Sequence, residues 1–207
     1  GFKTVVELVL NTSRLMNAIA CAGFMGRVYI EAGQYACHRQ AFGQAIASFP
    51  MVQEAIADIM SATYAATASS FYLAHLLDKI ETGQASEQDE KSYRMLVNIN
   101  KYITSITGSQ MIHRGIEVLG GNGAIESFSI LPRLYRDMVV LESWEGTHNV
   151  LCVQVLRDML RYQVHEPFLR FIAEKLATVK DESLIENAAK VKQAIQQAQQ
   201  MLGQFLQ

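Results

Sequence analysis

The sequence predicts an all-α fold: an antiparallel four-helix bundle with an additional helical C-terminal tail. Half of the 207 residues are hydrophobic and only 18% are charged, which is enough apolar side chain to build a core. Over long stretches the apolar residues recur at helical spacing, and the whole chain contains only three prolines. No stretch shows the period-two alternation that is typical of a β-strand. These three observations exclude a disordered chain and a loop-rich or all-β fold.

The first helix is expected from Thr4 to about Tyr35, because its apolar residues follow at helical intervals without a proline. At 1.5 Å per residue, this helix is roughly 45 Å long. Gly23, Gly26 and Gly33 would each weaken an isolated helix by about 1 kcal/mol. We therefore expect another backbone to approach closely at these glycines.

The second helix is expected to begin at Pro50 and to reach about Glu81. Proline is tolerated in a first helical turn because the N–H that it lacks would have no partner there. Residues 61–70 are nearly all small, which predicts a closely packed neighbouring helix.

The third helix is expected from Glu87 to about Leu119. Ser86, followed by acidic residues, is typical of a helix N-cap. The Gly-Gly-Asn-Gly segment at 120–123 ends the helix, because glycine and asparagine accept the left-handed conformation found at helix C-termini.

Residues 124–146 read as irregular, with one short helix near Leu134. A fourth helix is expected from near Thr147 to about Tyr162. Three or four long helices joined by short loops favour an antiparallel bundle.

The remaining part of the chain reads as a tail of one or two amphipathic helices, with Pro167 at its first boundary. We therefore divide the chain into a four-helix bundle at 1–162 and a helical C-terminal extension at 163–207.

Composition and charge exclude several function classes. The net charge is -2, so no basic excess points to nucleic acid or to an anionic membrane surface. No run of about 18 apolar residues predicts a membrane span. The five histidines show no metal-ligand spacing, so we expect no metal site. The beginning of the chain has neither an initiator Met nor a signal-peptide layout, which suggests a piece cut from a longer protein.

Three cysteines, Cys21, Cys37 and Cys152, form no CxxC pair. A disulfide framework or a zinc site is therefore not indicated. We expect all three thiols to be packed in the core. Reduced thiols also suit a protein of the cytoplasm or of an organelle matrix.

Candidate chemistry lies in three irregular segments. At 39–43 an arginine beside a tight turn can reach an anion, or it is an ordinary surface arginine. At 119–123 the glycines leave backbone without side chains, which a ligand can approach closely; alternatively, the segment is a plain helix C-cap. At 144–149 a carboxylate lies between a tryptophan and a glycine, just ahead of a helix start that would favour a phosphate, or the segment is a capping turn.

In their order and spacing these segments resemble the C-terminal domain of the acyl-CoA dehydrogenase family. The matching strings are RQAFGQAI, EVLGGNG, YRDM and WEGT, and the resemblance spans about Gly1 to Arg161. The strings LPRLYRDM, WEGTHNV and CVQVLR are more similar to the alkylation-response (AidB-type) branch of that family. The resemblance implies a four-helix bundle, a bound FAD, and oxidation of an acyl-CoA at its α and β carbons.

The resemblance also implies roles for individual residues. Glu145 matches the catalytic base, and Ser13, at the position where some members carry the base instead, cannot act as one. Asn11 and Arg14 match contacts to the CoA part of the substrate, with Asn11 replacing an aspartate.

The flavin contacts that the resemblance implies fall into two sets. Arg39, Glu117 and Gly121 match contacts to the FAD of a neighbouring subunit. Glu117 stands in place of the usual glutamine, and an ionised carboxylate cannot donate a hydrogen bond and would repel a phosphate. Thr147 and Asn149 match FAD contacts within the subunit, with Asn149 shorter than the usual glutamine.

Complete members of the family place a helical domain and a β-domain ahead of this bundle, and neither is encoded in these residues. The resemblance therefore implies the C-terminal domain of a larger flavoprotein, inactive as an isolated piece. It further implies a homodimer or homotetramer, and an electron-transfer flavoprotein or another acceptor for the electrons.

Two other function classes stay open. One is an alkylation-response flavoprotein that protects DNA, but residues 163–207 hold five basic and five acidic side chains, whereas phosphate binding favours a basic excess. The other is a non-catalytic oligomerisation bundle, which the presence of Arg39, Glu145 and the 120–123 segment disfavours.

Overall fold

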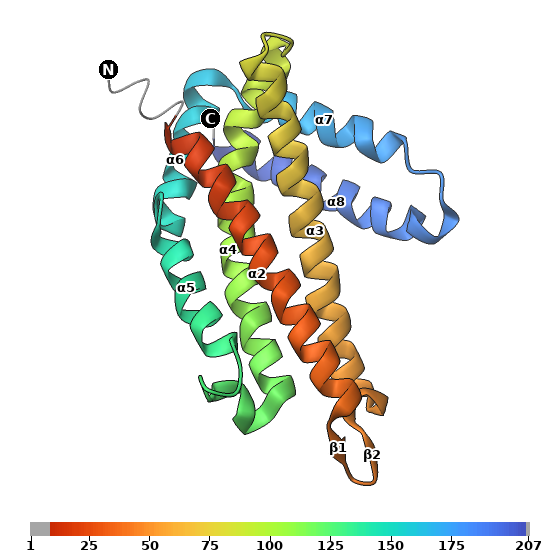
Figure 1. Cartoon of the computed structure of the whole chain (residues 1–207). Helices are drawn as coiled ribbons and strands as arrows, with labels where there is room; N and C mark the ends of the chain where they lie inside the picture. Colours follow the sequence, from red (N-terminus) through yellow and green to blue (C-terminus); the bar gives the residue numbers. More distant parts are fainter. Residues whose placement is uncertain (1–8, 206–207) are drawn as a thin grey trace.

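The computed structural model describes residues 9–205, which form a bundle of helices with a helical hairpin across one end (Figure 1). The first three columns of the bundle are α2 (Asn11–His38), α3 (Pro50–Glu81) and α4 (Glu87–Leu119). The fourth column consists of α5 (Leu131–Ser143) followed by α6 (His148–Tyr162), one above the other along the same edge (Figure 1). The predicted all-α bundle is confirmed.

The helices α3 and α4 begin and end where their local signals place them, whereas α2 ends at His38 and not near Tyr35, and its expected start at Thr4 lies outside the described residues. Pro50 is in the first turn of α3, which ends at Glu81 as expected. Ser86 caps α4: its hydroxyl accepts from the Asp89 N–H, and the Asp89 carboxylate accepts from the Ser86 N–H in return. This reciprocal pair satisfies two N–H groups that would otherwise lack a partner. α4 ends at Leu119, and residues 120–124 continue as the short 3₁₀ helix η3 (Gly120–Ala124).

The fourth column differs from the sequence expectation. The short helix expected near Leu134 is present, but it is the 13-residue α5 and forms half of this column. Its buried side chains, Leu131, Leu134, Met138 and Leu141, share one face that packs on α2 and α4. Since α5 and α6 are separated only by residues 144–147, the WEGT turn lies on the side of the bundle and not at its end (Figure 1).

A small hairpin that the sequence reading did not anticipate follows α2. The strands β1 (Gln40–Ala41) and β2 (Gln44–Ala45) pair antiparallel, and η2 (Ile46–Ser48) leads into α3. The two loop residues, Phe42 and Gly43, both have positive φ, of 51° and 85°. Two consecutive left-handed residues are the requirement of a type I′ turn, which suits a two-residue hairpin.

The core runs along the inside of the bundle. Its largest cluster joins α2, α3, α4 and α5, and consists of Cys21, Val28, Ala32, Ile59, Ile112, Leu119, Leu131, Leu134, Met138 and Leu141. A second cluster at the other end of the bundle consists of Leu15, Leu73, Leu76, Tyr93 and Val97.

The glycines at which a neighbouring helix packs closely are on α4 and not on α2. A Cβ added at Gly23 or Gly33 would meet nothing within 4 Å, and one at Gly26 would make an ordinary contact, so our expectation for these glycines is wrong. At Gly108 and Gly115, by contrast, an added Cβ would lie less than 3.0 Å from a side chain of the facing helix. The tight packing is therefore imposed by α4.

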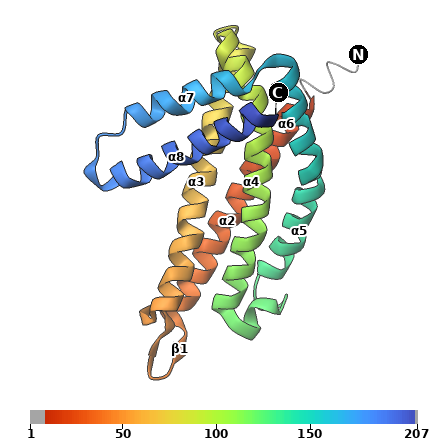
Figure 2. The same ribbon diagram turned by 180° about the vertical axis from the view of Figure 1, so that it is seen from behind.

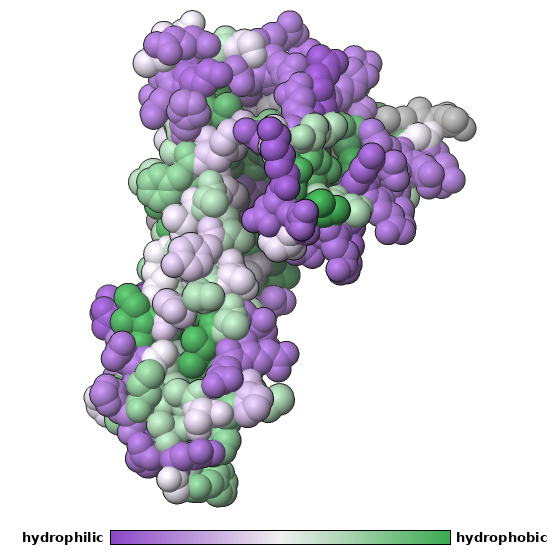
Figure 3. Space-filling view, turned by 90° about the vertical axis from the view of Figure 1, so that its right-hand side faces the viewer, coloured by the Kyte–Doolittle hydropathy of each residue, from purple (hydrophilic) through white to green (hydrophobic). Residues whose placement is uncertain are grey.

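The small-residue stretch at 61–70 is only partly covered. Ala66 and Ser70 are buried against the bundle. Several other residues of the stretch line a hollow of about 390 Å³ between α3 and α4. Figure 3 shows this side of the molecule, where apolar surface lies open along the bundle. The expected close neighbour thus packs along one edge of the stretch.

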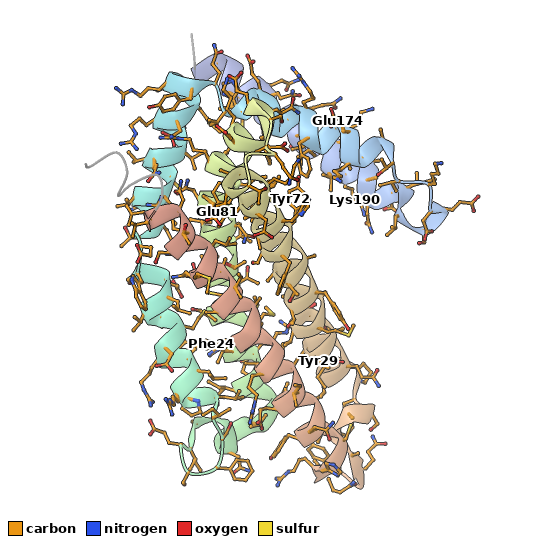
Figure 4. All side chains as sticks on the ribbon, turned by 45° about the horizontal axis from the view of Figure 1, so that its top comes forward. Phe24, Tyr29, Tyr72, Glu81, Glu174 and Lys190 are labelled. Atoms are coloured by element: carbon orange, nitrogen blue, oxygen red, sulfur yellow. The ribbon has the colours of Figure 1, made fainter. Side chains whose placement is uncertain are left out.

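The tail forms a hairpin of two helices, α7 (His165–Ala177) and α8 (Glu182–Phe205), which crosses one end of the bundle and extends past α3 (Figures 1 and 2). Pro167 lies in the first turn of α7. Tyr72 of α3 stacks on Phe171 of α7, with ring centroids 5.1 Å apart, where the hairpin leaves the bundle (Figure 4). The division of the chain into a bundle at 1–162 and an extension at 163–207 stays a prediction.

Only one cysteine matches the expected core position. Cys21 is buried, whereas Cys37 and Cys152 are exposed, so the core prediction is wrong for these two. Residues 9–205 contain no helix that is long and apolar enough to cross a membrane. Within the same residues, no three His, Cys, Asp or Glu side chains gather as a metal site would require.

Candidate active site

The turn between α5 and α6 carries Glu145. Its backbone is left-handed, with φ of 60°, and Gly146 follows at 109°. A non-glycine residue in this region costs of order 1–3 kcal/mol and persists only where its surroundings impose it. The Glu145 residue is half-buried, and Trp144 beside it is 58% exposed, so the turn faces the outside of the bundle.

A buried arginine on α2 holds this turn. Arg14 is 2% exposed, and its Nε donates to the Glu145 carbonyl at 3.0 Å. One terminal nitrogen donates to Asn98 Oδ1 of α4 at 2.7 Å and makes a longer contact of 3.5 Å to Asn11 Oδ1. Burial lowers the pKa of the Arg14 guanidinium, while the nearby charge of Glu145 acts in the opposite sense.

A buried lysine on α4 holds the same turn from the other side. Lys101 is 0% exposed, and its Nζ donates to the carbonyls of Glu142 at 2.7 Å and Gly146 at 2.9 Å. Burial lowers the pKa of this ammonium. Arg14 and Lys101 together therefore engage the carbonyls of three residues between 142 and 146.

The first turn of α6 completes this region. Thr147 occupies the N-cap position, as the sequence predicts, but its side chain makes no capping hydrogen bond. Thr147 and Asn149 are both exposed beside Glu145 in the chain. His148 points inward instead: its ring packs edge-on against Tyr102 at 4.7 Å, and its Nε2 lies 3.3 Å from the Ser105 hydroxyl.

A second group of candidate residues gathers at the far end of α2. Arg39, Glu117 and Gly121 line one hollow of about 290 Å³, together with Tyr35 and Asn122. Asn122 Nδ2 donates to the Tyr35 hydroxyl at 3.2 Å, which fixes the 120–123 segment to α2. The sequence order alone did not show that the arginine and the glycine loop meet here.

The glycines of the 120–123 segment differ in what they require. Gly120 has φ of 62°, and a Cβ at Gly123 would lie 2.5 Å from the Ile116 carbonyl oxygen, so both are explained by conformation or packing. A Cβ at Gly121 would meet nothing within 4 Å. Its backbone therefore stays open to a ligand approaching the hollow.

Glu117 is the one residue of the hollow that does not suit an anion. Its side chain is 67% exposed, and its carboxylate lies 3.9 Å from His113 one turn away. The guanidinium of Arg39 and the bare backbone at Gly121 suit a phosphate. An ionised Glu117 would oppose a phosphate placed beside it.

The two groups are well separated. Arg14 and Arg39 are 25 residues apart on α2 and its C-cap, or about 37 Å at 1.5 Å per residue. Asn11 and Arg14 thus belong with the Glu145 turn, and Arg39, Glu117 and Gly121 form a distinct surface.

Sequence reasoning missed Lys101, Asn98 and Asp158. Asp158 of α6 is 1% exposed and accepts from Arg94 Nε at 2.8 Å, which brings a buried ion pair close to Arg14. Each of these residues sits in a helical stretch without any local motif. Their only sequence signal is a charged or amide side chain at a helix position that the periodicity turns inward.

A comparison with family models decides the membership of the chain. Residues 1–160 match the model described as "Acyl-CoA dehydrogenase, C-terminal domain". This chain belongs to the acyl-CoA dehydrogenase family. Among curated relatives of the domain, acyl-CoA dehydrogenase family member 11 of Caenorhabditis elegans is 32% identical over 200 residues, which are 95% of this chain and 32% of the relative. The putative acyl-CoA dehydrogenase AidB of Escherichia coli is 31% identical over 140 residues, 68% of this chain and 25% of AidB.

Solved structures of acyl-CoA dehydrogenases share the fold. The structure of C. elegans ACDH-11 in complex with C11-CoA superposes with a TM-score of 0.89 at 31% identity, covering 94% of this chain and 33% of that one. An acyl-CoA dehydrogenase of Bacillus anthracis complexed with FAD gives 0.70 at 27% identity, over 89% and 34%. The chain therefore spans between a quarter and about a third of the length of these relatives.

Proposed function

We propose that this chain is the C-terminal domain of an FAD-dependent acyl-CoA dehydrogenase, in which Glu145 is the catalytic base. The observation that carries the proposal is the Glu145 turn, which two buried cations hold in a left-handed conformation on the open side of the bundle. Strained backbone that the interior imposes is typical of functional sites. Family membership and relatives solved with C11-CoA or FAD support the reaction class.

In this mechanism the Glu145 carboxylate accepts the proton from the α-carbon of the thioester, and the electron pair left behind forms the α,β double bond as a hydride leaves the β-carbon. FAD, when bound, supplies the acceptor for that hydride. Arg14 fixes the main chain of the base through the Glu145 carbonyl. The half-buried position of Glu145 limits competing contact with water.

We assign the flavin to two sets of residues on this chain. Thr147 and Asn149, exposed at the N-terminus of α6, would contact the flavin of the same subunit. Arg39 and Gly121 would hold the diphosphate of a neighbour's flavin, because their hollow suits an anion. Glu117 does not suit that contact when ionised, so we expect it to lie away from the phosphates.

The separation of about 37 Å along α2 supports an oligomer. One flavin cannot reach both sets of residues, so each complete site would need a second copy of the chain, in a homodimer or homotetramer. Sedimentation of the full-length protein should show a dimer or larger, and a monomer that retains stoichiometric FAD would contradict the shared site.

Substrate and partners follow from the same assignment. Asn11, at the edge of a hollow of about 430 Å³ with Lys91, is our candidate contact for the CoA part of an acyl-CoA. The contacts of Arg14 described above are all internal, so its contribution to CoA binding would be indirect. We further propose that an electron-transfer flavoprotein or another acceptor reoxidises the flavin, in the cytoplasm or an organelle matrix.

The test is anaerobic bleaching of the flavin of the full-length protein by a panel of acyl-CoAs. Glu145→Gln keeps the shape of the side chain and removes the base, so bleaching should slow by about 10²–10⁴-fold while FAD stays bound. Asp137→Asn, an exposed carboxylate on α5, is the matched control and should bleach normally. Bleaching that survives in Glu145→Gln would place the base elsewhere.

Arg39→Ala should have a different effect from Glu145→Gln. It removes a charge-assisted contact worth roughly 1.5–3 kcal/mol, so the flavin should dissociate about 10- to 100-fold more readily while the bound fraction still bleaches. Flavin retention on dilution, followed by fluorescence, measures this. Unchanged retention would show that Arg39 is an ordinary surface arginine.

A DNA-protective function is the second candidate, because the strings LPRLYRDM, WEGTHNV and CVQVLR resemble the alkylation-response branch of the family. The balanced charge of residues 163–207 counts against it. A wild-type protein that no acyl-CoA bleaches, and that binds duplex DNA with a steep salt dependence, would favour this second function.

A further inference from the structure

Lys101 is a buried titratable side chain that takes no part in the chemical steps of the proposed reaction. It lies in the middle of α4, at 0% exposure. A charged side chain without access to water is strongly disfavoured unless its hydrogen-bonding groups are satisfied. Its ammonium donates to two main-chain carbonyls, of Glu142 and Gly146. Burying this second cation beside Arg14 is costly, so a structural reason for it is needed.

The carbonyls of Glu142 and Gly146 both lie where the regular helix pattern supplies no hydrogen-bond donor. Glu142 lies in the last turn of α5, where the final carbonyls of a helix have no intrahelical partner. A cation there also complements the negative end of the helix dipole. Gly146 precedes α6 and has φ of 109°, so it is outside any regular hydrogen-bonding pattern.

The two acceptors also enclose the base. Glu142 and Gly146 are four residues apart, and Glu145 is between them with φ of 60°. An ammonium that binds both carbonyls fixes the distance across the turn. Arg14 holds the Glu145 carbonyl from α2, so the turn is fastened to two different helices of the bundle.

We infer that Lys101 is a positioning residue: by bridging the carbonyls of Glu142 and Gly146, it sets the left-handed turn that aims the Glu145 carboxylate. This rests on the proposed role of Glu145 as base. Lys101 has no accessible surface and so does not meet the substrate itself. Its function is to keep the end of α5 and the start of α6 in one fixed relation.

The test substitutes Lys101→Met in the full-length protein, which keeps an unbranched apolar stem, one atom shorter than lysine, and removes all three donors. Misplacing a catalytic group by about 1 Å costs on the order of 100-fold in rate. We expect kcat to fall by about that factor, with KM for the acyl-CoA and FAD content unchanged. A loss of folded enzyme would also lower the apparent kcat at unchanged KM, but it would lower the FAD content in proportion, so kcat is counted per bound FAD.

Hydrogen exchange supplies a second measurement that needs no activity. The amides of Trp144 and Leu151 bond to the carbonyls of Val140 and Thr147 and flank the turn. In Lys101→Met both should exchange at least tenfold faster, relative to the Thr82 amide at the distant end of α3.

The matched control is Asn100→Ala. Asn100 is the buried neighbour of Lys101 on α4, and its amide donates to Ser70 of α3, away from the turn. This variant should lose stability while kcat and the exchange at Trp144 and Leu151 stay within about threefold of wild type. The same losses in Asn100→Ala would show that Lys101 acts only through stability.

The outcomes separate this inference from the proposed function. If Glu145→Gln is inactive while Lys101→Met keeps kcat, the positioning role is refuted and the base stands. If Glu145→Gln stays active, the base is wrong, and the exchange rates alone decide whether Lys101 sets the turn. Should Lys101→Met fail to fold, Lys101→Arg retains a buried cation with a different reach, and wild-type kcat and exchange in that variant would overturn the inference.

Discussion

Replacing Gly115 with alanine tests how α2 and α4 are packed. An added Cβ at Gly115 would lie less than 3.0 Å from Cγ1 of Val28, which is fully buried on α2. Valine is stiff at χ1, so it cannot rotate away without strain. The same two helices carry Arg14 and Lys101, and a shift between them would reach the Glu145 turn.

The expected magnitude is the difference of two effects. Glycine to alanine in a helix interior gains about 1 kcal/mol from propensity. Overpacking a well-filled core typically costs about 1–3 kcal/mol, and a contact this short belongs at the upper end of that range. We therefore expect Gly115→Ala to lower the free energy of unfolding by about 1–2 kcal/mol.

Urea unfolding of the chain, followed by circular dichroism, measures this change. Gly33→Ala is the control, because an added Cβ there meets nothing within 4 Å and only the propensity gain remains. Gly33→Ala should stabilise the protein by up to about 1 kcal/mol. If Gly115→Ala stabilises it equally, the two helices are not in the close contact that the structure shows.

Two further predictions concern ionisable side chains. Burial raises the pKa of the Cys21 thiol to about 12, so a thiol reagent such as Ellman's should react with Cys37 and Cys152 in the native protein and with Cys21 only after unfolding; three fast thiols would refute the burial. The hydrogen bond from Lys79 lowers the pKa of Asp89 to about 2, below its ordinary 3.8. The native state therefore gains stability from Asp89 above about pH 4 and loses it as pH falls towards 2, so Asp89→Ala should cost about 1 kcal/mol at pH 7 and little near pH 2, as urea unfolding at both pH values would show.

The sequence by itself determined the helices α3 and α4 and their ends. Pro50, Ser86 and the 120–123 glycines act within one turn of the chain, and the structure places the ends of α3 and α4 where these residues predict them. A cap or a proline changes only backbone groups three or four residues away, so no distant partner is needed to interpret it. The ordered strings at 39–43, 120–123 and 144–149 likewise carried the family resemblance.

The full length of α5 and the small hairpin were less visible in the sequence. The four buried residues of α5 follow helical spacing, but a 13-residue helix between two irregular segments gives few periods to count. The exposed positions of Cys37 and Cys152 were also missed, because residue type predicts burial only on average.

Only the tertiary structure decided how the Glu145 turn is held. Arg14 is 131 residues from the carbonyl that it binds, and Lys101 is 41 and 45 residues from its two acceptors. Lysine and arginine side chains are mostly exposed, so a sequence reading places them on the surface of a helix. These two are buried because the folded bundle brings unpaired carbonyls to them, and that pairing exists only after α2, α4 and α5 have packed together.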